Sequence, residues 1–243
     1  MKRVKGNSSD RTPNTSEEFQ DWHKKAIDIF SSSKFERILD VGCAGGNFSL
    51  LLKEACSAKE VCGIEIDECG ANLARQKGVG AHCLNLDHEA FPFESEYFDA
   101  IYVGEVIEHL YDPDHMLEEC YRVLKDGGLL VLTTRNLSSL YNRLTLLLGY
   151  QPFSTSVSLR HNIGRPFKLD DEILGDHIRV FTYRALREIL ELNGFDCLVA
   201  HGTGSALPPG KGNYFAQSIR LCDKILARVP SLSQGLALEC RKR

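Results

Sequence analysis

Short apolar runs alternate with amphipathic segments along most of the chain. Runs rich in branched and aromatic residues predict strands, and apolar residues spaced three or four apart predict helices. The predicted strands are residues 37–41, 61–66, 82–84, 98–104, 129–133, 195–200 and 236–240. The predicted helices cover 17–30, 71–77, 182–192 and 215–228. Two more are predicted: one begins at Phe48, and the other begins at the Asp112-Pro113 cap and ends before Gly127. This alternation predicts a doubly wound, Rossmann-like α/β fold.

The alternation lapses after Thr134 and resumes at Thr182. We therefore expect one domain over residues 17–243, preceded by a polar, flexible tail at 1–16 and interrupted by a helical insertion at 136–176. The insertion mixes aromatic and basic residues, which suits a lid over a substrate. The alternative is a purely structural helix whose apolar face, formed by Leu140, Leu144 and Leu147, packs on the sheet.

A glycine-rich turn follows the first predicted strand and reads Gly42-Cys43-Ala44-Gly45-Gly46. Glycines between a strand and a helix let the backbone approach a ligand, and the helix start offers free N–H groups. The turn departs from the GxGxxG spacing of dinucleotide-binding folds. Asp40, two residues before Gly42, suits a ligand that carries an amino group, such as S-adenosylmethionine (SAM), and would repel a pyrophosphate.

Two more acids follow the next two predicted strands. Glu65 can accept hydrogen bonds from ribose hydroxyls, and Asp87 can accept one from an adenine amino group. Carboxyl ends of parallel strands are where open α/β sheets bind ligands. The predicted cofactor-binding residues are Asp40, Gly42, Cys43, Gly45, Gly46, Asn47, Glu65, Ile66, Asp87, His88, Gly104 and Glu105.

Four motifs together carry a family resemblance. They are ILDVGCAGGN at 38–47, GIEID at 63–67, the Asp87 to Phe93 segment before Tyr97-Phe98-Asp99, and YRVLKDGG at 121–128. In order and spacing they resemble class I SAM-dependent methyltransferases over about residues 36–135. The resemblance implies SAM as cofactor, a seven-stranded sheet whose last strand is antiparallel, methionine binding at Asp40 and Gly42, ribose binding at Glu65, adenine binding at Asp87 and His88, and contact of Gly104 with the cofactor.

The segment after the fourth predicted strand reads Gly104-Glu105-Val106-Ile107-Glu108-His109. It lacks the Asn/Asp-Pro-Pro-aromatic and Pro-Cys signatures of many N- and C5-methylating enzymes, which favours a hydroxyl acceptor. It resembles quinone-precursor and small-RNA O-methyltransferases, in which such residues hold a divalent metal. On a helical turn, Glu105, Glu108 and His109 could converge on one ion. Alternatively, Glu108 and His109 only bond local backbone.

His177, in Gly175-Asp176-His177-Ile178-Arg179, completes the candidates as a further ligand or as the general base. The predicted catalytic residues are therefore Glu108, His109 and His177. A metal would lower the pKa of an acceptor hydroxyl. The pattern around the insertion also resembles bacterial and archaeal methyltransferases associated with glycans or lipids.

Charge and cysteine content bear on the kind of acceptor and on the compartment in which the protein works. Residues 1–135 sum to −9 and residues 136–243 to +5, for a net charge of −4. The basic second part suits an anionic acceptor, or it is scattered solvated surface. Nine cysteines without a CxxC pair, and no apolar leader after Met1, favour reduced thiols in a cytoplasmic protein. No apolar run is long enough to cross a bilayer.

The function predicted from sequence is thus methyl transfer from SAM to a hydroxyl of a small molecule, glycan or lipid. Three alternatives stay open: an RNA 2′-O-methyltransferase, although the acidic sum and the lack of an RNA-binding domain weigh against nucleic acid; a non-catalytic SAM-binding subunit; and an NAD-dependent dehydrogenase.

Overall fold

The computed structural model describes residues 20–158, 161, 163–165, 177–204 and 225–243. Their elements run in the order α1 (Asp21–Phe30), β1 (Arg37–Val41), α2 (Asn47–Cys56), β2 (Glu60–Glu65), α3 (Glu68–Gln76), β3 (Gly80–Cys83), β4 (Phe98–Gly104), η1 (Ile107–His109), α4 (Pro113–Val123), β5 (Leu124–Arg135), α5 (Leu140–Leu147), α6 (Tyr183–Leu192), β6 (Phe195–Thr203) and β7 (Gly235–Lys242). The predicted tail at 1–16 lies outside the described residues, as does most of the predicted helix at 215–228.

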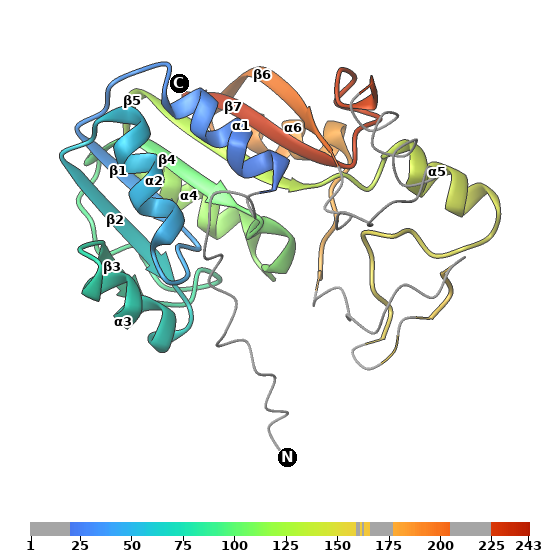
Figure 1. The fold of residues 1–243 in the computed structure, drawn as a ribbon, viewed down its shortest axis with the longest axis horizontal. Coiled ribbons are helices and arrows are strands. Elements are labelled where there is room, and N and C mark those ends of the chain that lie inside the picture. The colour runs from blue at the N-terminus through green and yellow to red at the C-terminus, as the bar shows by residue number, and fades with distance from the viewer. Residues whose placement is uncertain (1–19, 159–160, 162, 166–176, 205–224) are drawn as a thin grey trace, which may run out of the picture.

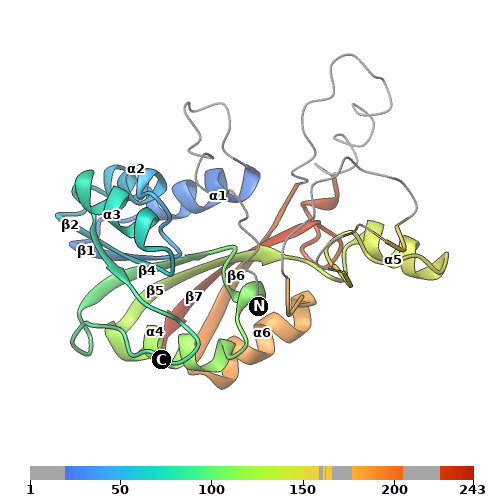
Figure 2. The same cartoon turned by 90° about the horizontal axis from the view of Figure 1, so that it is seen from below.

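The strands form one seven-stranded sheet in the order β3-β2-β1-β4-β5-β7-β6. Strands β1 to β5 pair in parallel, and β7 pairs antiparallel with β5 and β6. The predicted fold class and antiparallel last strand are therefore confirmed. Helices α1, α2 and α3 cover one face of the sheet, and α4 and α6 cover the other (Figures 1 and 2).

Each face of the sheet has its own apolar core. The α1–α3 side packs Phe30, Leu52 and Ala74 against β1 and its neighbours. The α4 and α6 side packs Met116 and Leu190 against the middle strands. Most of β4 and residues 128–134 of β5 are buried, as parallel strands covered on both faces must be. The sheet is therefore a rigid frame whose strand ends hold the loops.

The helix that begins at Asp112-Pro113 ends earlier than the glycine signal predicts. The Asp112 side chain caps it by accepting from the N–H of His115, with Pro113 at the first turn, as expected. It ends at Val123, because Leu124 already has extended backbone and pairs with Phe98. Gly127, at φ +68°, lies within the irregular start of β5.

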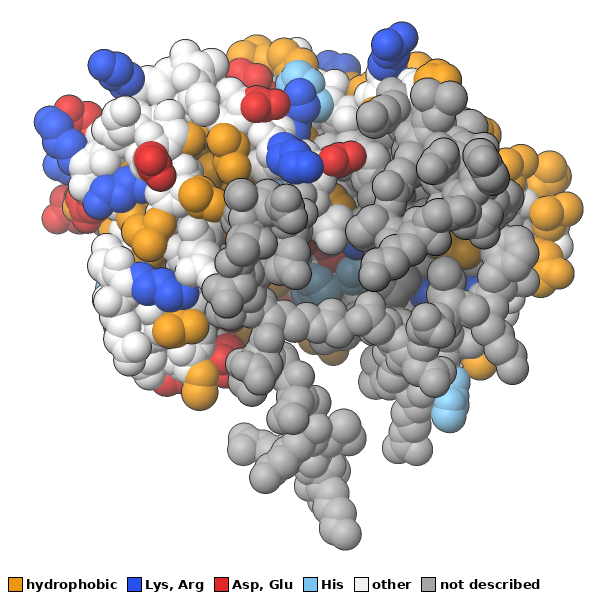
Figure 3. All heavy atoms as spheres, in the orientation of Figure 1, with side chains coloured by type: hydrophobic (Ala, Val, Ile, Leu, Met, Phe, Trp, Pro, Cys, Tyr) orange, Lys and Arg blue, Asp and Glu red, His pale blue; other side chains and the backbone are white. Residues whose placement is uncertain are grey.

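The apolar face of α5 does not pack on the sheet, so the structural alternative for this helix is wrong. Leu144, Leu146 and Leu147 are 48%, 55% and 81% exposed, whereas Asn142 and Thr145 are buried. Hydrophobic side chains gather at this edge of the molecule in Figure 3. The helix is held by polar contacts instead, and its role as a substrate lid stays a prediction. None of the described helices is long and apolar enough to span a membrane.

Candidate functional site

The glycine turn connects β1 to α2 in a conformation that requires glycine at two positions. Gly42 and Gly46 have φ of +84° and +77°. A Cβ on Gly42 would lie 2.3 Å from Cγ2 of Val106, so the turn packs directly against the segment after β4. The N–H groups of Gly42 and Cys43 donate to the Ile64 carbonyl on β2. The turn is therefore fixed between two neighbouring strand ends.

Asp40 is the buried acid behind this turn. Its carboxylate is 2% exposed and accepts a 2.6 Å hydrogen bond from Ser49 Oγ on α2. Burial raises the pKa of Asp40 to about 7, with a smaller contribution from Glu65, while the Ser49 bond opposes the rise. A buried carboxylate of this kind is stabilised in its charged form by a cationic group placed beside it, as the ammonium group of SAM would be.

Glu65 ends β2 and folds back over the glycine turn. Its carboxylate accepts from the N–H of Ala44 at 2.8 Å and from those of Ile66 and Asp67. Glu65 thus lies at the predicted place, next to the turn, and in this structure it holds the loop closed. Ile66 is 67% exposed beside it.

Asp87 follows β3, and its side chain stabilises the local structure. Its Oδ1 accepts from the backbone N–H of Tyr111 and Asp112, which ties this loop to the start of α4. Asp87 Oδ2 is not used in these bonds. The His88 N–H, predicted to meet the adenine ring, donates to the Asn85 carbonyl.

Two predicted cofactor residues point elsewhere. The thiol of Cys43 is buried against Gly63 of β2, and burial raises its pKa, so it belongs to the core rather than to the ligand side of the turn. The side chain of Asn47 accepts from Lys77 Nζ, which also bonds the Gly45 carbonyl. Gly45 and Gly46 pack against α3, since a Cβ on either would meet Leu73 or Ala74.

The end of β4 carries a strained residue. Glu105 has φ +53°, unusual for a residue with a side chain, and follows Gly104. Its carboxylate pairs with Arg135 at the end of β5, 3.3 Å away, and the Arg135 guanidinium lies 5.0 Å from the centre of the Trp22 ring. Burial and the neighbouring Glu108 raise the pKa of Glu105, and Arg135 opposes this. Sequence reasoning did not identify Arg135.

Glu108, His109 and His177 converge as a three-residue cluster. One potential ligand atom from each lies within 4.8 Å of the other two, and the two histidine rings are 4.9 Å apart. Glu105 is not part of the cluster, because its carboxylate turns to Arg135. Histidine and acidic side chains are visible in a recess near the middle of the molecule in Figure 3.

Backbone contacts bring the distant His177 to this cluster. The Glu108 carbonyl accepts from the N–H groups of Ile178 and Arg179, at 2.9 and 3.1 Å. His177 Nδ1 lies 3.0 Å from the Ser154 carbonyl. Because a carbonyl only accepts, this bond places a proton on Nδ1, and the neutral ring then carries its lone pair on Nε2.

Glu108 itself is fully buried and only half satisfied. Oε2 accepts a 2.7 Å bond from Thr134 Oγ1, whereas Oε1 is buried with no hydrogen-bond partner among the described residues. Buried carboxylate oxygens are rarely left in this state. Two imidazoles and a carboxylate oxygen are a donor set that divalent transition metals accept, so the residues fit an ion.

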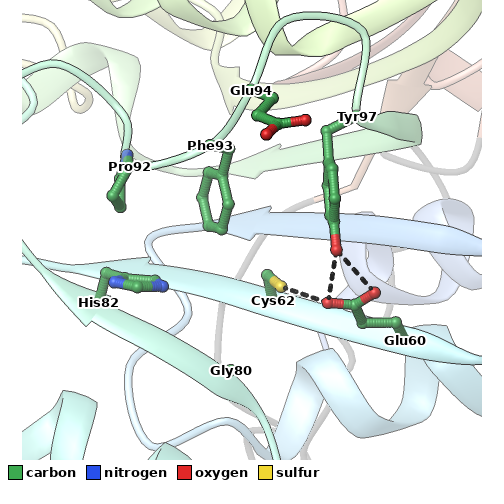
Figure 4. A pocket seen from close by; sticks show the side chains of 8 residues that line it. All are labelled: Glu60, Cys62, Gly80, His82, Pro92, Phe93, Glu94 and Tyr97. Carbon is green, nitrogen blue, oxygen red and sulfur yellow. Dashed lines mark hydrogen bonds between the residues drawn. The ribbon is translucent and has the colours of Figure 1, made fainter.

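A separate cavity of about 420 Å³ lies at the other end of β2. Figure 4 shows Tyr97 donating to the Glu60 carboxylate, with Cys62, His82 and Phe93 around them. Glu60 begins β2 whereas Glu65 ends it, so this cavity lies toward the opposite end of the strands from the glycine turn. We assign it no part in the candidate site.

Comparisons with known proteins find similarity to methyltransferases. Residues 39–132 match the family model described as a methyltransferase domain. A demethylmenaquinone methyltransferase from Thermus thermophilus is 33% identical over 115 residues, which cover 46% of this chain and 52% of that protein. A ubiquinone biosynthesis O-methyltransferase from Pseudomonas putida is 33% identical over 117 residues, 45% of this chain and 49% of that protein. The chain thus spans about half the length of these curated relatives.

Solved structures extend the similarity of fold across most of the chain. A SAM-dependent methyltransferase from Mesorhizobium loti aligns with a TM-score of 0.57 at 18% identity, covering 91% of this chain and 98% of that one. One from Archaeoglobus fulgidus aligns with a TM-score of 0.55 at 20% identity, covering 90% of each. At such identities the alignments show the fold alone.

Proposed function

We propose that this chain is a class I SAM-dependent methyltransferase that transfers a methyl group from SAM to an acceptor hydroxyl, starting from the match of residues 39–132 to a methyltransferase domain. The observation that supports a hydroxyl acceptor most directly is the cluster of Glu108, His109 and His177. Glu108 and His109 lie just beyond the end of β4, in the segment that packs against the glycine turn, and His177 joins them from a distant part of the chain.

On the cofactor side, Asp40 and Glu65 lie at the ends of β1 and β2 beside the glycine turn, and Asp87 lies in the loop after β3. Asp40 would face the amino group of the methionine part of SAM. Glu65 would bind the ribose, with its carboxylate accepting from the ribose hydroxyls in place of its present backbone N–H partners. SAM supplies an electrophilic methyl group on a sulfonium, which is already a good leaving group. The protein therefore has to align the acceptor and take up its proton.

On the acceptor side, Glu108 Oε1, His109 and His177 Nε2 would hold one divalent cation after small side-chain rotations. The ion, when bound, lowers the pKa of a hydroxyl next to it. Thr134 and Ser154 hold two of the three ligands in place. Without an ion, the same Nε2 lone pair of His177 is the natural acceptor for the hydroxyl proton.

The acceptor class is the least constrained part of the proposal. We propose a small molecule or lipid with a phenolic or similarly acidic hydroxyl, by analogy with relatives named for ubiquinone and menaquinone biosynthesis. Exposed leucines on α5, on the insertion that follows β5, suit an acceptor with an apolar part. Glycan acceptors fit this surface less well.

Calorimetry with SAM, its demethylated product and NAD tests the cofactor assignment. We expect SAM and the product to bind near micromolar, about −8 kcal/mol, and NAD not to bind. Asp40→Asn and Glu65→Gln should each weaken SAM binding, with Asp28→Asn, an exposed acid on α1, as the matched control. Binding of NAD in preference to SAM would refute the proposal.

Titration with Mn²⁺, followed by the electron paramagnetic resonance signal of the free ion, tests the cluster without requiring the acceptor. Glu108→Gln and His177→Ala should weaken binding at least tenfold. Glu105→Gln should leave it unchanged, because that carboxylate pairs with Arg135. Equal loss of Mn²⁺ binding in the Glu105 variant would reject this ligand set. Catechol is a simple phenolic acceptor, and if EDTA does not slow its methylation, the reaction needs no metal and His177 would act as the general base.

A further inference from the structure

Two cysteines face each other across the last two strands of the sheet. Cys197 on β6 and Cys240 on β7 are direct partners in the antiparallel register. The Cys240 thiol donates to Cys197 Sγ at a sulfur–sulfur distance of 3.0 Å. Strand β6 is at the edge of the sheet, and its register shifts between Cys197 and Val199, so the pair is next to an irregularity in the ladder.

The antiparallel pairing of Cys197 with Cys240 is of the kind that can accommodate a disulfide. Directly opposed residues on antiparallel strands have Cα atoms roughly 4.5–5.5 Å apart. Disulfides form with Cα separations of roughly 4.4–6.8 Å. Rotation of the two side chains alone therefore brings the sulfurs into bonding range.

The two thiols are not equivalent. Cys197 is half-buried, whereas Cys240 is fully buried in the core beneath α6. The shared hydrogen bond lowers the pKa of Cys197 and raises that of Cys240. Burial of Cys197 opposes this lowering, as do the charges of Glu191 and Asp196, whereas Arg187 on α6 adds to it. Cys197 is thus the less buried of the two thiols and the one whose pKa is lowered, so we expect an external reagent to react with it first.

We propose that Cys197 and Cys240 form a thiol–disulfide exchange site for low-molecular-weight disulfides such as oxidised glutathione. The Cys197 thiolate attacks one sulfur of the reagent, breaking its S–S bond and releasing one glutathione thiolate. The Cys240 thiolate then attacks Cys197 Sγ in the mixed disulfide and releases the second. The protein loses two electrons and two protons, and the reagent becomes two thiols.

The resulting bond would join the edge strand β6 to β7 and close the chain between positions 197 and 240 into a loop. A cross-link of this kind restricts the unfolded chain. Neither cysteine belongs to the candidate methyl-transfer site. The proposed thiol–disulfide exchange site can therefore be tested independently of the proposed function.

The test incubates the full-length reduced protein with oxidised glutathione, alkylates free thiols and maps peptides by mass spectrometry. The wild type should give a Cys197–Cys240 peptide that dithiothreitol releases. Cys240→Ala should instead accumulate glutathione on Cys197. In Cys197→Ala, Cys240 should stay a free thiol because it is buried.

Cys69→Ala serves as the matched control, since Cys69 is exposed on α3, and it should leave the cross-link intact. Wild-type protein that carries glutathione on Cys197 without the cross-link would overturn the proposal. Labelling of Cys240 in the Cys197 variant at the wild-type rate would overturn the order of attack. The wild-type protein alone shows whether the Cys197–Cys240 cross-link forms. The proposal can therefore be rejected even if one of the variants fails to fold.

Discussion

Thr134 Oγ1 donates a 2.7 Å hydrogen bond to Glu108 Oε2, and this contact fixes which oxygen of the carboxylate faces the two histidines. Both residues are fully buried. Thr134 comes from the end of β5 and Glu108 from the turn after β4, two strands that pair in parallel up to Gly104 and Thr133. The sheet register therefore sets the orientation of the cluster.

Replacement of Thr134 by Val should weaken metal binding and turnover. The change removes the hydroxyl with little loss of volume and frees Glu108 to rotate, and loss of such supporting bonds typically costs about 10–100-fold in metal affinity. Thr134→Ser keeps the donor and should retain wild-type affinity. Mn²⁺ titration of the two variants separates the cases, and equal affinities would show that Thr134 does not orient the ligand.

The stability of the ligand-free protein should carry a signature of Asp40. The folded protein keeps the Asp40 proton up to about pH 7, whereas the unfolded chain releases it near 4. Between these values the folded state binds more protons, so the stability contributed by this group falls as pH rises. Three units correspond to a maximum of roughly 4 kcal/mol.

Denaturant unfolding of wild type and Asp40→Asn from pH 4 to pH 8 measures this contribution. The amide does not titrate, so the free energy of unfolding of the variant should rise relative to wild type up to about pH 7 and then level off. Asp28→Asn, whose side chain is 72% exposed, should run parallel to wild type. A constant difference between Asp40→Asn and wild type would contradict the raised pKa.

Gly42→Ala should destabilise the protein and abolish SAM binding. A side chain at φ +84° costs about 1–2 kcal/mol, and the new Cβ also overlaps Val106 at 2.3 Å, which adds about 1–3 kcal/mol. Gly127→Ala is a close control, because Gly127 also has positive φ but nothing within 4 Å of the new Cβ. Comparable losses in thermal unfolding for both variants would argue against a crowded turn.

The elements and the cofactor side of the site follow from the sequence, because strand ends and glycine turns are local signals. All seven predicted strands form, and Asp40 and Glu65 meet at the glycine turn. The sequence does not tell that Arg135 takes Glu105 away from the metal candidates, or that Thr134 and Ser154 orient Glu108 and His177. Those partners come from other strands and loops, and only the sheet register brings them together.

Helix α5 is the clearest case in which the hydrophobic pattern predicts the wrong face. Asn142 is 2% exposed and satisfies its whole side chain. Its Nδ2 donates to the Asn136 carbonyl at 3.0 Å and to Ser154 Oγ at 2.8 Å, and Oδ1 accepts from the Phe153 N–H at 2.9 Å. These bonds hold both flanks of the helix, and because Leu144, Leu146 and Leu147 are 48–81% exposed, the polar contacts decide its orientation.

Substitutions on the two faces of α5 should therefore have effects opposite to those expected from hydrophobicity. Asn142→Ala leaves one buried and two partly buried groups without their Asn142 partner and should lower the free energy of unfolding by about 2–4 kcal/mol. Leu147→Ser, at a position 81% exposed, should change it by less than about 0.5 kcal/mol. Because Asn142 also bonds Ser154, whose carbonyl accepts from His177, Asn142→Ala should weaken Mn²⁺ binding as well. Chemical denaturation and metal titration of both variants check this, and a Leu147 variant less stable than the Asn142 variant would show that the leucines, not the asparagine, anchor the helix.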